Sequence, residues 1–349
     1  MIDNEYIGRV LRLPEKQIVD AIETTEVVES NTALVMKINV QIGGDDAYAK
    51  RLFVKTIKGN QSENVYHSKN MREGEFYQIV KDNKINYIPV PVCYDAFISE
   101  EEKKFLIVLD DISGEYITPS NASIHEHKTW FSCAESLAKL HAAFWNHKII
   151  DAMRGEYIEE VQSGDSPYIK KVKERVPLFI SEFDNQFDAK TKETLEKAAE
   201  INIMSVNETA RRIIDNNNVT ICNGDSHIHN FMLPVSDSDM PLIVDFQFWG
   251  EGIGTGDLAH LTRVKFSDEL KREIQLSVVE HYYKTLLANG VVGYSWDNCL
   301  RDYHMSVASM VLIPMWQYTG FKIAHDEWKD DLQGLIYNFD YLKCGELLL

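Results

Sequence analysis

Polar side chains that could do chemistry are concentrated in one run, NGDSHIHN, at residues 223–230. Asp225 and Asn230 lie five positions apart in it, a spacing expected about once by chance in a chain of this size. The run lies between two apolar segments typical of strands, VTIC and PLIVDFQ, and the second contains Asp245. This order predicts that Asp225, Asn230 and Asp245 lie at the mouth of one small sheet.

Two carboxylates and an amide in this order suit phosphoryl transfer. One carboxylate accepts the proton of the attacking hydroxyl, and a second carboxylate and an amide oxygen hold Mg²⁺, which prefers oxygen ligands. The reaction also needs a lysine at the nucleotide phosphates. Lys55 in LFVK has apolar neighbours on a predicted strand, where an unpaired ammonium would be costly. Glu73 on the next predicted helix is its natural partner, and Glu75, on another face of that helix, is the fallback.

The elements that must position these groups change in character near residue 110. Alternating apolar residues before this point predict a hairpin, then a helix, then two strands, the first placed at a sheet edge or strand start by its prolines. Helical spacing dominates after it. We therefore expect an α+β fold, with a small β-rich N-lobe at residues 1–110 and a larger helical C-lobe at 111–349. The expected strands cover 33–43, 51–57, 87–99 and 104–112, and the expected helices 62–83, 127–147, 189–216, 267–289 and 296–318.

Composition restricts the partners and the compartment. The net charge of −18 argues against nucleic acid, which requires a basic surface. No apolar stretch approaches the length that spans a bilayer, and the acidic N-terminus has no apolar core of a signal peptide. Five scattered cysteines with no CxxC fit reduced thiols. We expect a cytoplasmic protein, monomer or homodimer, with no membrane or nucleic-acid partner.

Seven stretches between Lys55 and Leu261 resemble the motifs of kinase-like small-molecule phosphotransferases, in the same order. These proteins include the aminoglycoside phosphotransferases and choline kinases, and the chain resembles the ecdysteroid-kinase-like (CHK) group most. The resemblance implies a protein-kinase-like two-lobe fold. It also implies Mg²⁺-dependent transfer of the γ-phosphoryl group of ATP, or of GTP, to a hydroxyl group of a small molecule. The stretches are LFVK, REGEFY, LIVLDDIS, ESLAKLHAAFW, NGDSHIHN, LIVDFQ and GDLAHL.

The same resemblance implies a role for each matching position. Asp225 would be the catalytic base, Asn230 and Asp245 would bind Mg²⁺, and Lys55 and Glu73 would position the phosphates. The backbone of 106–111 would meet the adenine, and Asp257 would hold the catalytic loop in place. The nucleotide-binding residues of that segment would be Val108, Leu109 and Asp110.

The sequence departs from the family pattern at two places. Asn223 stands where the family usually has histidine before Gly-Asp, and we expect activity to survive this change. The turn that should cover the phosphates has no glycine. Ser30, Asn31 and Thr32 there can still offer hydroxyl and backbone N–H groups to phosphate.

Other functions stay open at this point. The glycine-free turn favours a nucleotide-binding pseudoenzyme on the same fold. His227 and His229 could instead form the HxH pair of a metal-dependent hydrolase, although no further strand–helix alternation follows them. His141 is expected to be a satisfied core histidine, and the run GEGIGTGD at 250–257 a flexible turn.

The acceptor substrate is not specified by these residues. The negative charge favours a cation, such as an amino sugar or a choline-like alcohol. The aromatic and Met-rich segment 305–316 favours a lipophilic alcohol almost equally.

Overall fold

The computed structural model describes most of the chain and forms two compact units. The first unit is Met1–Thr118 with Asn230–Trp249, and the second is Pro119–His229 with Gly250–Leu349. No helix in the described part of the chain is long and apolar enough to cross a membrane. The described residues are 2–29, 33–44, 47–57, 65–85, 87–99, 101, 104–152, 156–164, 166–236, 239–263, 268–321 and 325–349.

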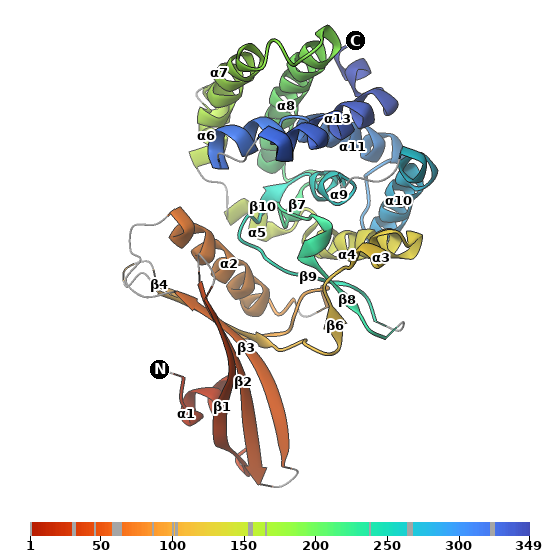
Figure 1. Ribbon diagram of the computed structural model, residues 1–349. Helices are drawn as coiled ribbons and strands as arrows, with labels where there is room; N and C mark the ends of the chain where they lie inside the picture. Colours follow the sequence, from red (N-terminus) through yellow and green to blue (C-terminus); the bar gives the residue numbers. More distant parts are fainter. Residues whose placement is uncertain are drawn as a thin grey trace. The chain divides into compact units, whose positions relative to one another are not determined.

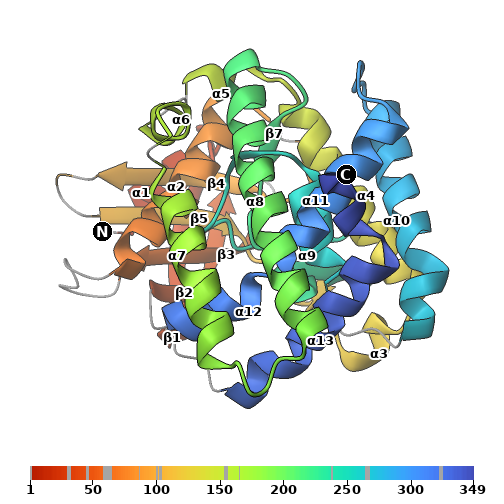
Figure 2. The same ribbon diagram turned by 90° about the horizontal axis from the view of Figure 1, so that it is seen from above.

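The first unit contains a five-stranded antiparallel sheet in the order β1-β2-β3-β5-β4, of which Figure 1 labels β1 to β4 and Figure 2 also labels β5. The expected hairpin is confirmed, because β2 pairs with β3 from Ala33↔Ile57 to Ile42↔Tyr48. β4 starts after Pro91 and lies at the sheet edge, as its prolines predicted. The elements are α1 (Asn4–Val10), β1 (Gln17–Glu29), β2 (Ala33–Gly44), β3 (Tyr48–Ile57), α2 (Val65–Asp82), β4 (Cys93–Ser99) and β5 (Lys104–Asp110).

Alternation along the strands determines which side chains meet α1 and which meet α2. Ile38, Val40 and Ile42 of β2 and Leu52 and Val54 of β3 recur at every second position and are buried in one apolar cluster with α1. Successive side chains of a strand point to opposite faces. Lys55 therefore points away from this cluster.

The prediction of one small sheet around the polar run is wrong, because the structure has two separate small sheets there. β7 (Thr220–Cys222) pairs with β10 (Gly250–Gly252) in the second unit. β8 (Phe231–Pro234) instead pairs with β6 (Tyr116–Ile117) and β9 (Leu242–Ile243) in the first unit. The segment that leads to Asp225 and the segment that leads to Asp245 thus belong to different sheets.

The second unit is mainly helical. α8, its longest described helix, packs against α7 and α11 (Figure 2). The helix expected over 296–318 is broken, because α11 ends at Met310 and a short helix with Pro314 in its first turn follows. The helices are α3 (Asn121–Ile124), α4 (His127–Phe144), α5 (Lys148–Ala152), α6 (Glu156–Gln162), α7 (Pro167–Glu182), α8 (Ala189–Asp215), η1 (Ile228–Asn230), α9 (Thr255–Leu261), α10 (Asp268–Ala288), α11 (Trp296–Met310), α12 (Ile313–Trp316), η2 (Gln317–Phe321), α13 (His325–Tyr341) and η3 (Cys344–Leu348).

Candidate functional site

Lys55 and Glu73 form a buried ion pair in the first unit. The ammonium of Lys55 on β3 donates a hydrogen bond to the carboxylate of Glu73 on α2, and the two side chains are only 13% and 6% exposed. Burial raises the pKa of Glu73, and Asp245 raises it too, whereas the charge of Lys55 opposes this shift. Removing one member of such a pair would leave the other charge buried without compensation. The pairing predicted for Lys55 is therefore present, and Glu73 rather than Glu75 is its partner.

Asp245 follows β9 with a left-handed backbone, at φ 59°. Most side chains avoid this region, although aspartate tolerates it better, and strained residues concentrate at functional sites. The next residue, Phe246, is fully buried and stacks on Phe76 of α2 with 3.6 Å between ring centroids. Trp249 and Arg72 of α2 each donate a hydrogen bond to the other's carbonyl oxygen. These contacts hold the segment carrying Asp245 against α2.

Asn230 joins Asp245 in the first unit through β8 and β9. Its backbone carbonyl accepts a hydrogen bond of 2.9 Å from the N–H of Val244, the neighbour of Asp245. Asn230 is 8% exposed. The amide and the carboxylate together provide the oxygen donors that Mg²⁺ prefers, so this pair of side chains fits the ion.

A cavity of about 360 Å³ gathers most of those predicted nucleotide residues of this unit that the structure describes. Lys55, Glu73 and Asp245 line one part of it. Leu109 and Asp110, from the end of β5, line another. Apolar side chains from both sheets complete the wall, namely Val35, Phe53, Met232 and Val244. The lining thus combines apolar side chains with several charged ones, and a concave, mostly apolar surface with a few polar groups is typical of a small-molecule site.

One expectation for nucleotide binding turns out differently, and another falls outside the described residues. Val108 lies within β5, between β3 and β4, and is fully buried in the apolar cluster with α1 rather than at the cavity. The described lining extends beyond β5 through Asp111, Ile112 and Ser113 instead. Ser30, Asn31 and Thr32, expected to cover the phosphates, lie outside the described residues.

In the second unit, Asp257 of α9 holds the loop that contains Asp225. Its buried carboxylate accepts hydrogen bonds from the backbone N–H groups of Asn223 (2.6 Å) and Gly224 (2.9 Å). The same carboxylate contacts Nε2 of His141 at 3.1 Å. Burial alone would raise its pKa, but His141 and the two backbone hydrogen bonds outweigh burial and lower the pKa, so the carboxylate stays ionised. Asp257 thus has the loop-holding position that the sequence resemblance implied.

His141 is a satisfied core histidine, as expected. Its side chain is fully buried, and its Nδ1 lies 2.8 Å from the hydroxyl of Tyr282 while Nε2 meets Asp257. Gly254 lies directly against this pair, where a β-carbon would come within 2.5 Å of the Tyr282 hydroxyl. The run GEGIGTGD is therefore not a flexible turn. It forms β10 and the start of α9, and close packing requires glycine at position 254.

Asn223 shapes the loop from its first residue. Its side-chain oxygen accepts hydrogen bonds from the backbone N–H of Asp225 (3.1 Å) and from the hydroxyl of Ser226 (3.2 Å). Asparagine commonly accepts a bond from the backbone two residues later in such turns. The residue that departs from the family pattern therefore positions the proposed base directly.

Asp225 is partly exposed and has two histidines beside it. Nδ1 of His260 lies 3.6 Å from its carboxylate, and Nε2 of His227 lies 3.8 Å from it. Burial lowers the pKa of His260 to about 3, with further lowering by Arg263 and His227. His260 is consequently uncharged at neutral pH and adds no positive charge beside Asp225. The sequence contained it in the motif GDLAHL, but nothing in the spacing marked it as a neighbour of Asp225.

A second cavity, of about 300 Å³, lies beside this loop within the second unit. Gly224, Asp257 and His260 line one side of it. Hydroxyl and amide side chains from α8 and α11 line much of the rest, with Met310 and Ile313 as apolar members. The polar residues are Asn202, Ser205, Thr209, Ser306 and Ser309. The cavity offers hydrogen-bonding groups next to the proposed base.

The histidine metal site suggested by HxH gains no support. His229 is exposed, and its ring centroid lies 6.1 Å from that of His227. The group of possible ligands found among the described residues is a different one, His141, Cys222 and Asp257. There the carboxylate and both imidazole nitrogens already bond protein groups, and burial raises the pKa of the Cys222 thiol, which disfavours the thiolate needed to bind a metal.

Known protein structures with a similar fold include two aminoglycoside phosphotransferases. The crystal structure of a putative aminoglycoside phosphotransferase from Ralstonia eutropha JMP134 matches with a TM-score of 0.55 and 12% identity, over 98% of this chain and 99% of that one. The GDP complex of an aminoglycoside 2'-phosphotransferase-IIIa mutant matches with a TM-score of 0.52 and 10% identity, over 99% of each chain. The fold is therefore the kinase-like fold of these phosphotransferases. A search of curated protein sequences gave no match.

The family model gives the relationship in sequence. The model of the ecdysteroid kinase-like family matches residues 29–290, which is most of the chain and contains Lys55, Glu73, Asp225 and Asp245. This chain belongs to the ecdysteroid kinase-like family.

Proposed function

We propose that the protein is an ATP-dependent kinase that phosphorylates a hydroxyl group of a small molecule. The observation that carries the proposal is the cavity of the first unit, where the buried Lys55–Glu73 pair and Asp245 line one space. A buried ammonium next to two carboxylates suits the phosphates of a metal-bound nucleotide. The apolar side chains of the lining, which include Val35 and Leu109, suit a flat base.

Each group has a definite task in this proposal. Lys55 binds the α- and β-phosphates, and Glu73 keeps its ammonium in place. Asn230 and Asp245 would hold Mg²⁺, which when bound neutralises charge on the phosphates. Asp225 accepts the proton of the acceptor hydroxyl as that oxygen attacks the γ-phosphorus and the bond to ADP breaks.

The cavity beside the Asp225 loop supports a neutral, hydroxylated acceptor rather than a cation. Its described lining contains one carboxylate, Asp257, and that carboxylate already accepts hydrogen bonds from two backbone groups and contacts His141. Within the described lining, an ammonium would find no carboxylate that is not already hydrogen-bonded, and Asp225 beside the cavity carries further negative charge. The hydroxyl and amide groups of α8 and α11 can instead bond the other hydroxyls of a polyol-like substrate.

Two aspartate variants test the reaction. Asp225→Asn should keep ATP·Mg²⁺ binding but lose about 10²- to 10⁴-fold in kcat, the usual contribution of a general base. Asp245→Asn should also lose the Mg²⁺-dependent part of ATP binding. Asp82→Asn, at an exposed position of α2, is the matched control and should behave as wild type.

The assays are a thermal-shift titration with ATP and Mg²⁺, and phosphorylation of a metabolite panel containing matched neutral and amino-substituted alcohols. Wild-type turnover by Asp225→Asn would refute the role of the base. Binding of ATP without transfer to any member of the panel would favour the nucleotide-binding pseudoenzyme. A preference for the amino-substituted members would contradict the neutral acceptor.

A further inference from the structure

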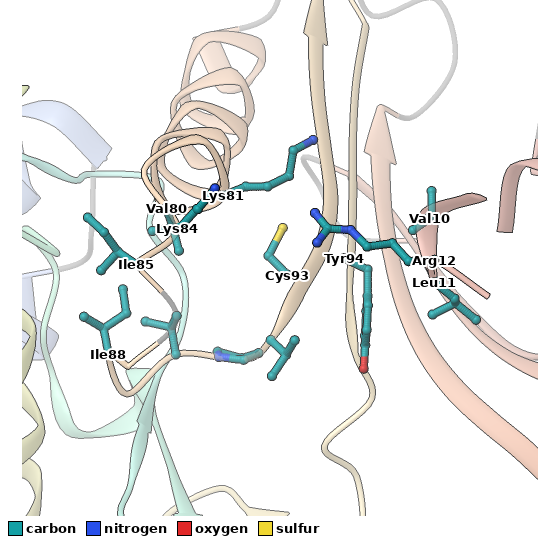
Figure 3. Close-up of a pocket in the computed structure, with 13 residues that line it drawn as sticks. Val10, Leu11, Arg12, Val80, Lys81, Lys84, Ile85, Ile88, Cys93 and Tyr94 are labelled. Carbon is teal, nitrogen blue, oxygen red and sulfur yellow. The ribbon is translucent and has the colours of Figure 1, made fainter. Parts of the chain in front are cut away.

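The first unit has another cavity, whose lining includes neither Lys55 nor Glu73. It encloses about 470 Å³ between the end of α1, the end of α2 and the start of β4 (Figure 3). Its apolar wall is formed by side chains that are each less than 10% exposed, namely Val10, Val80, Ile85, Ile88 and Val90. The volume is within the range of small-molecule sites.

Basic side chains surround this apolar wall. Arg12, Lys81 and Lys84 all line the cavity, and no aspartate or glutamate is among the described residues of its lining. Lys81 is engaged by Asp95 at 2.6 Å. Within the described chain, no ion pair is formed by the guanidinium of Arg12 or the ammonium of Lys84, and both residues are exposed. Two available positive charges at one apolar cavity are unexpected in a chain of net charge −18.

Arg12 and Lys84 also share an unusual backbone conformation. Arg12 and Lys84 follow the ends of α1 and α2, and both have left-handed backbones, at φ 53° and 55°. Glycine is the usual residue at such a position, because other residues pay about 1–2 kcal/mol there. A basic residue near a helix C-terminus also interacts favourably with the helix dipole, which accounts for a charge but not for the cavity beside it.

Figure 3 shows how the charges and the apolar wall are arranged. Arg12 extends from the segment after α1 toward Cys93, while Ile85 and Ile88 lie on the other side of the cavity. An anionic group near Arg12 and Lys84 could therefore be bound while an attached apolar chain contacts the isoleucines. Pro91 lines both this cavity and the one that holds Lys55.

We propose that this cavity binds a small organic anion with an apolar body, of which a medium-chain aliphatic carboxylate is the simplest form. The carboxylate pairs with Arg12 and Lys84, and the chain packs against the apolar wall formed by α2 and the residues that follow it. This site is independent of the proposed phosphoryl transfer, since its lining includes neither Lys55 nor Asp245.

Calorimetric titration of the full-length protein tests the proposal with decanoate as the probe. Decanol, decyl phosphate and decyltrimethylammonium separate the contributions of the apolar chain, the type of anion and the sign of the charge. Decanoate should bind at least about tenfold more tightly than decanol, the effect of one charge-assisted contact, and decyltrimethylammonium should not bind. Tighter binding of decyl phosphate than of decanoate would identify phosphate as the preferred head group of the same class of ligand.

Variants place the binding in this cavity. Arg12→Gln/Lys84→Gln should reduce decanoate affinity about tenfold or more and leave decanol unchanged, whereas Lys171→Gln/Lys173→Gln, at exposed positions of α7, removes the same charge and should have no effect. Cys93→Phe should block both probes by filling the cavity. Equal binding of decanoate and decanol, unchanged decanoate binding by the Arg12/Lys84 variant, or binding only to anionic vesicles and not to free decanoate would overturn the proposal.

Discussion

His260 should make the stability of the protein sensitive to mild acid. Its side chain is 11% exposed, and burial, with smaller effects from Arg263 and His227, lowers its pKa from 6.5 to about 3. The unfolded chain therefore binds a proton below pH 6.5 that the folded chain does not bind until about pH 3. Stability conferred by the neutral imidazole is complete above pH 6.5 and is lost progressively as the pH falls toward 3.

The size of this effect follows from the two pKa values. Each pH unit below 6.5 removes about 1.4 kcal/mol of unfolding free energy. Between pH 7.5 and 5.5 the contribution of His260 is thus about 1.4 kcal/mol, because only the lower unit lies in the sensitive window. Urea unfolding of wild type and of His260→Gln at both pH values measures it.

The variant should show a pH dependence smaller by that amount, since glutamine is polar but does not titrate here. Carboxylates and the other histidines contribute to both proteins and cancel in the comparison. His125→Gln, which removes an exposed imidazole, is the matched control. If wild type and His260→Gln lose the same free energy between the two pH values, the buried His260 is not held neutral and the reasoning fails.

Three further predictions concern the groups that hold the site. Lys55→Met should lower the unfolding free energy by about 3 kcal/mol in urea titrations, because it leaves the carboxylate of Glu73 buried without its partner. Adding Glu73→Gln should recover part of the loss. Equal losses in the single and the double variant would contradict a coupled pair. Asp257→Asn should lower the unfolding free energy by about 2 kcal/mol, measured by thermal or urea unfolding, because the new amide N–H₂ must face a backbone N–H of the loop. Unchanged stability would show that the loop does not depend on the carboxylate. Asn223→Ala should lower kcat while leaving the Kd for ATP unchanged, and a change confined to ATP binding would rule out its action through Asp225.

The local parts of the fold could be predicted from the sequence because they depend on neighbouring residues. The alternation of apolar residues in 33–57 specifies a hairpin whichever other strands join it. Prolines before Cys93 predict an edge position or a strand start for β4, and the structure has β4 at the edge and starting after Pro91. The Lys55–Glu73 pair was also foreseeable, because a lysine among apolar strand residues requires a nearby carboxylate.

The positions of other groups depend on contacts between segments distant in sequence. VTIC and LIVDFQ have the same apolar pattern, yet β7 pairs with β10 and β9 pairs with β8, so they belong to separate sheets. Val108 is as apolar as Leu109, but successive side chains of β5 point to opposite faces, and the packing of α1 on one face makes Val108 part of the core while Leu109 lines the cavity.

What the sequence determined by itself was the set of chemical groups and their order, since the types and spacing of Lys55, Glu73, Asp225 and Asp245 already predict phosphoryl transfer. Only the tertiary structure decided what surrounds them. It brought His260 beside Asp225, and it set Gly254 against His141 and Tyr282, where a β-carbon would not fit. The physical reason is that burial and hydrogen bonding at a site depend on segments far apart in the chain, which no local pattern of residue types encodes.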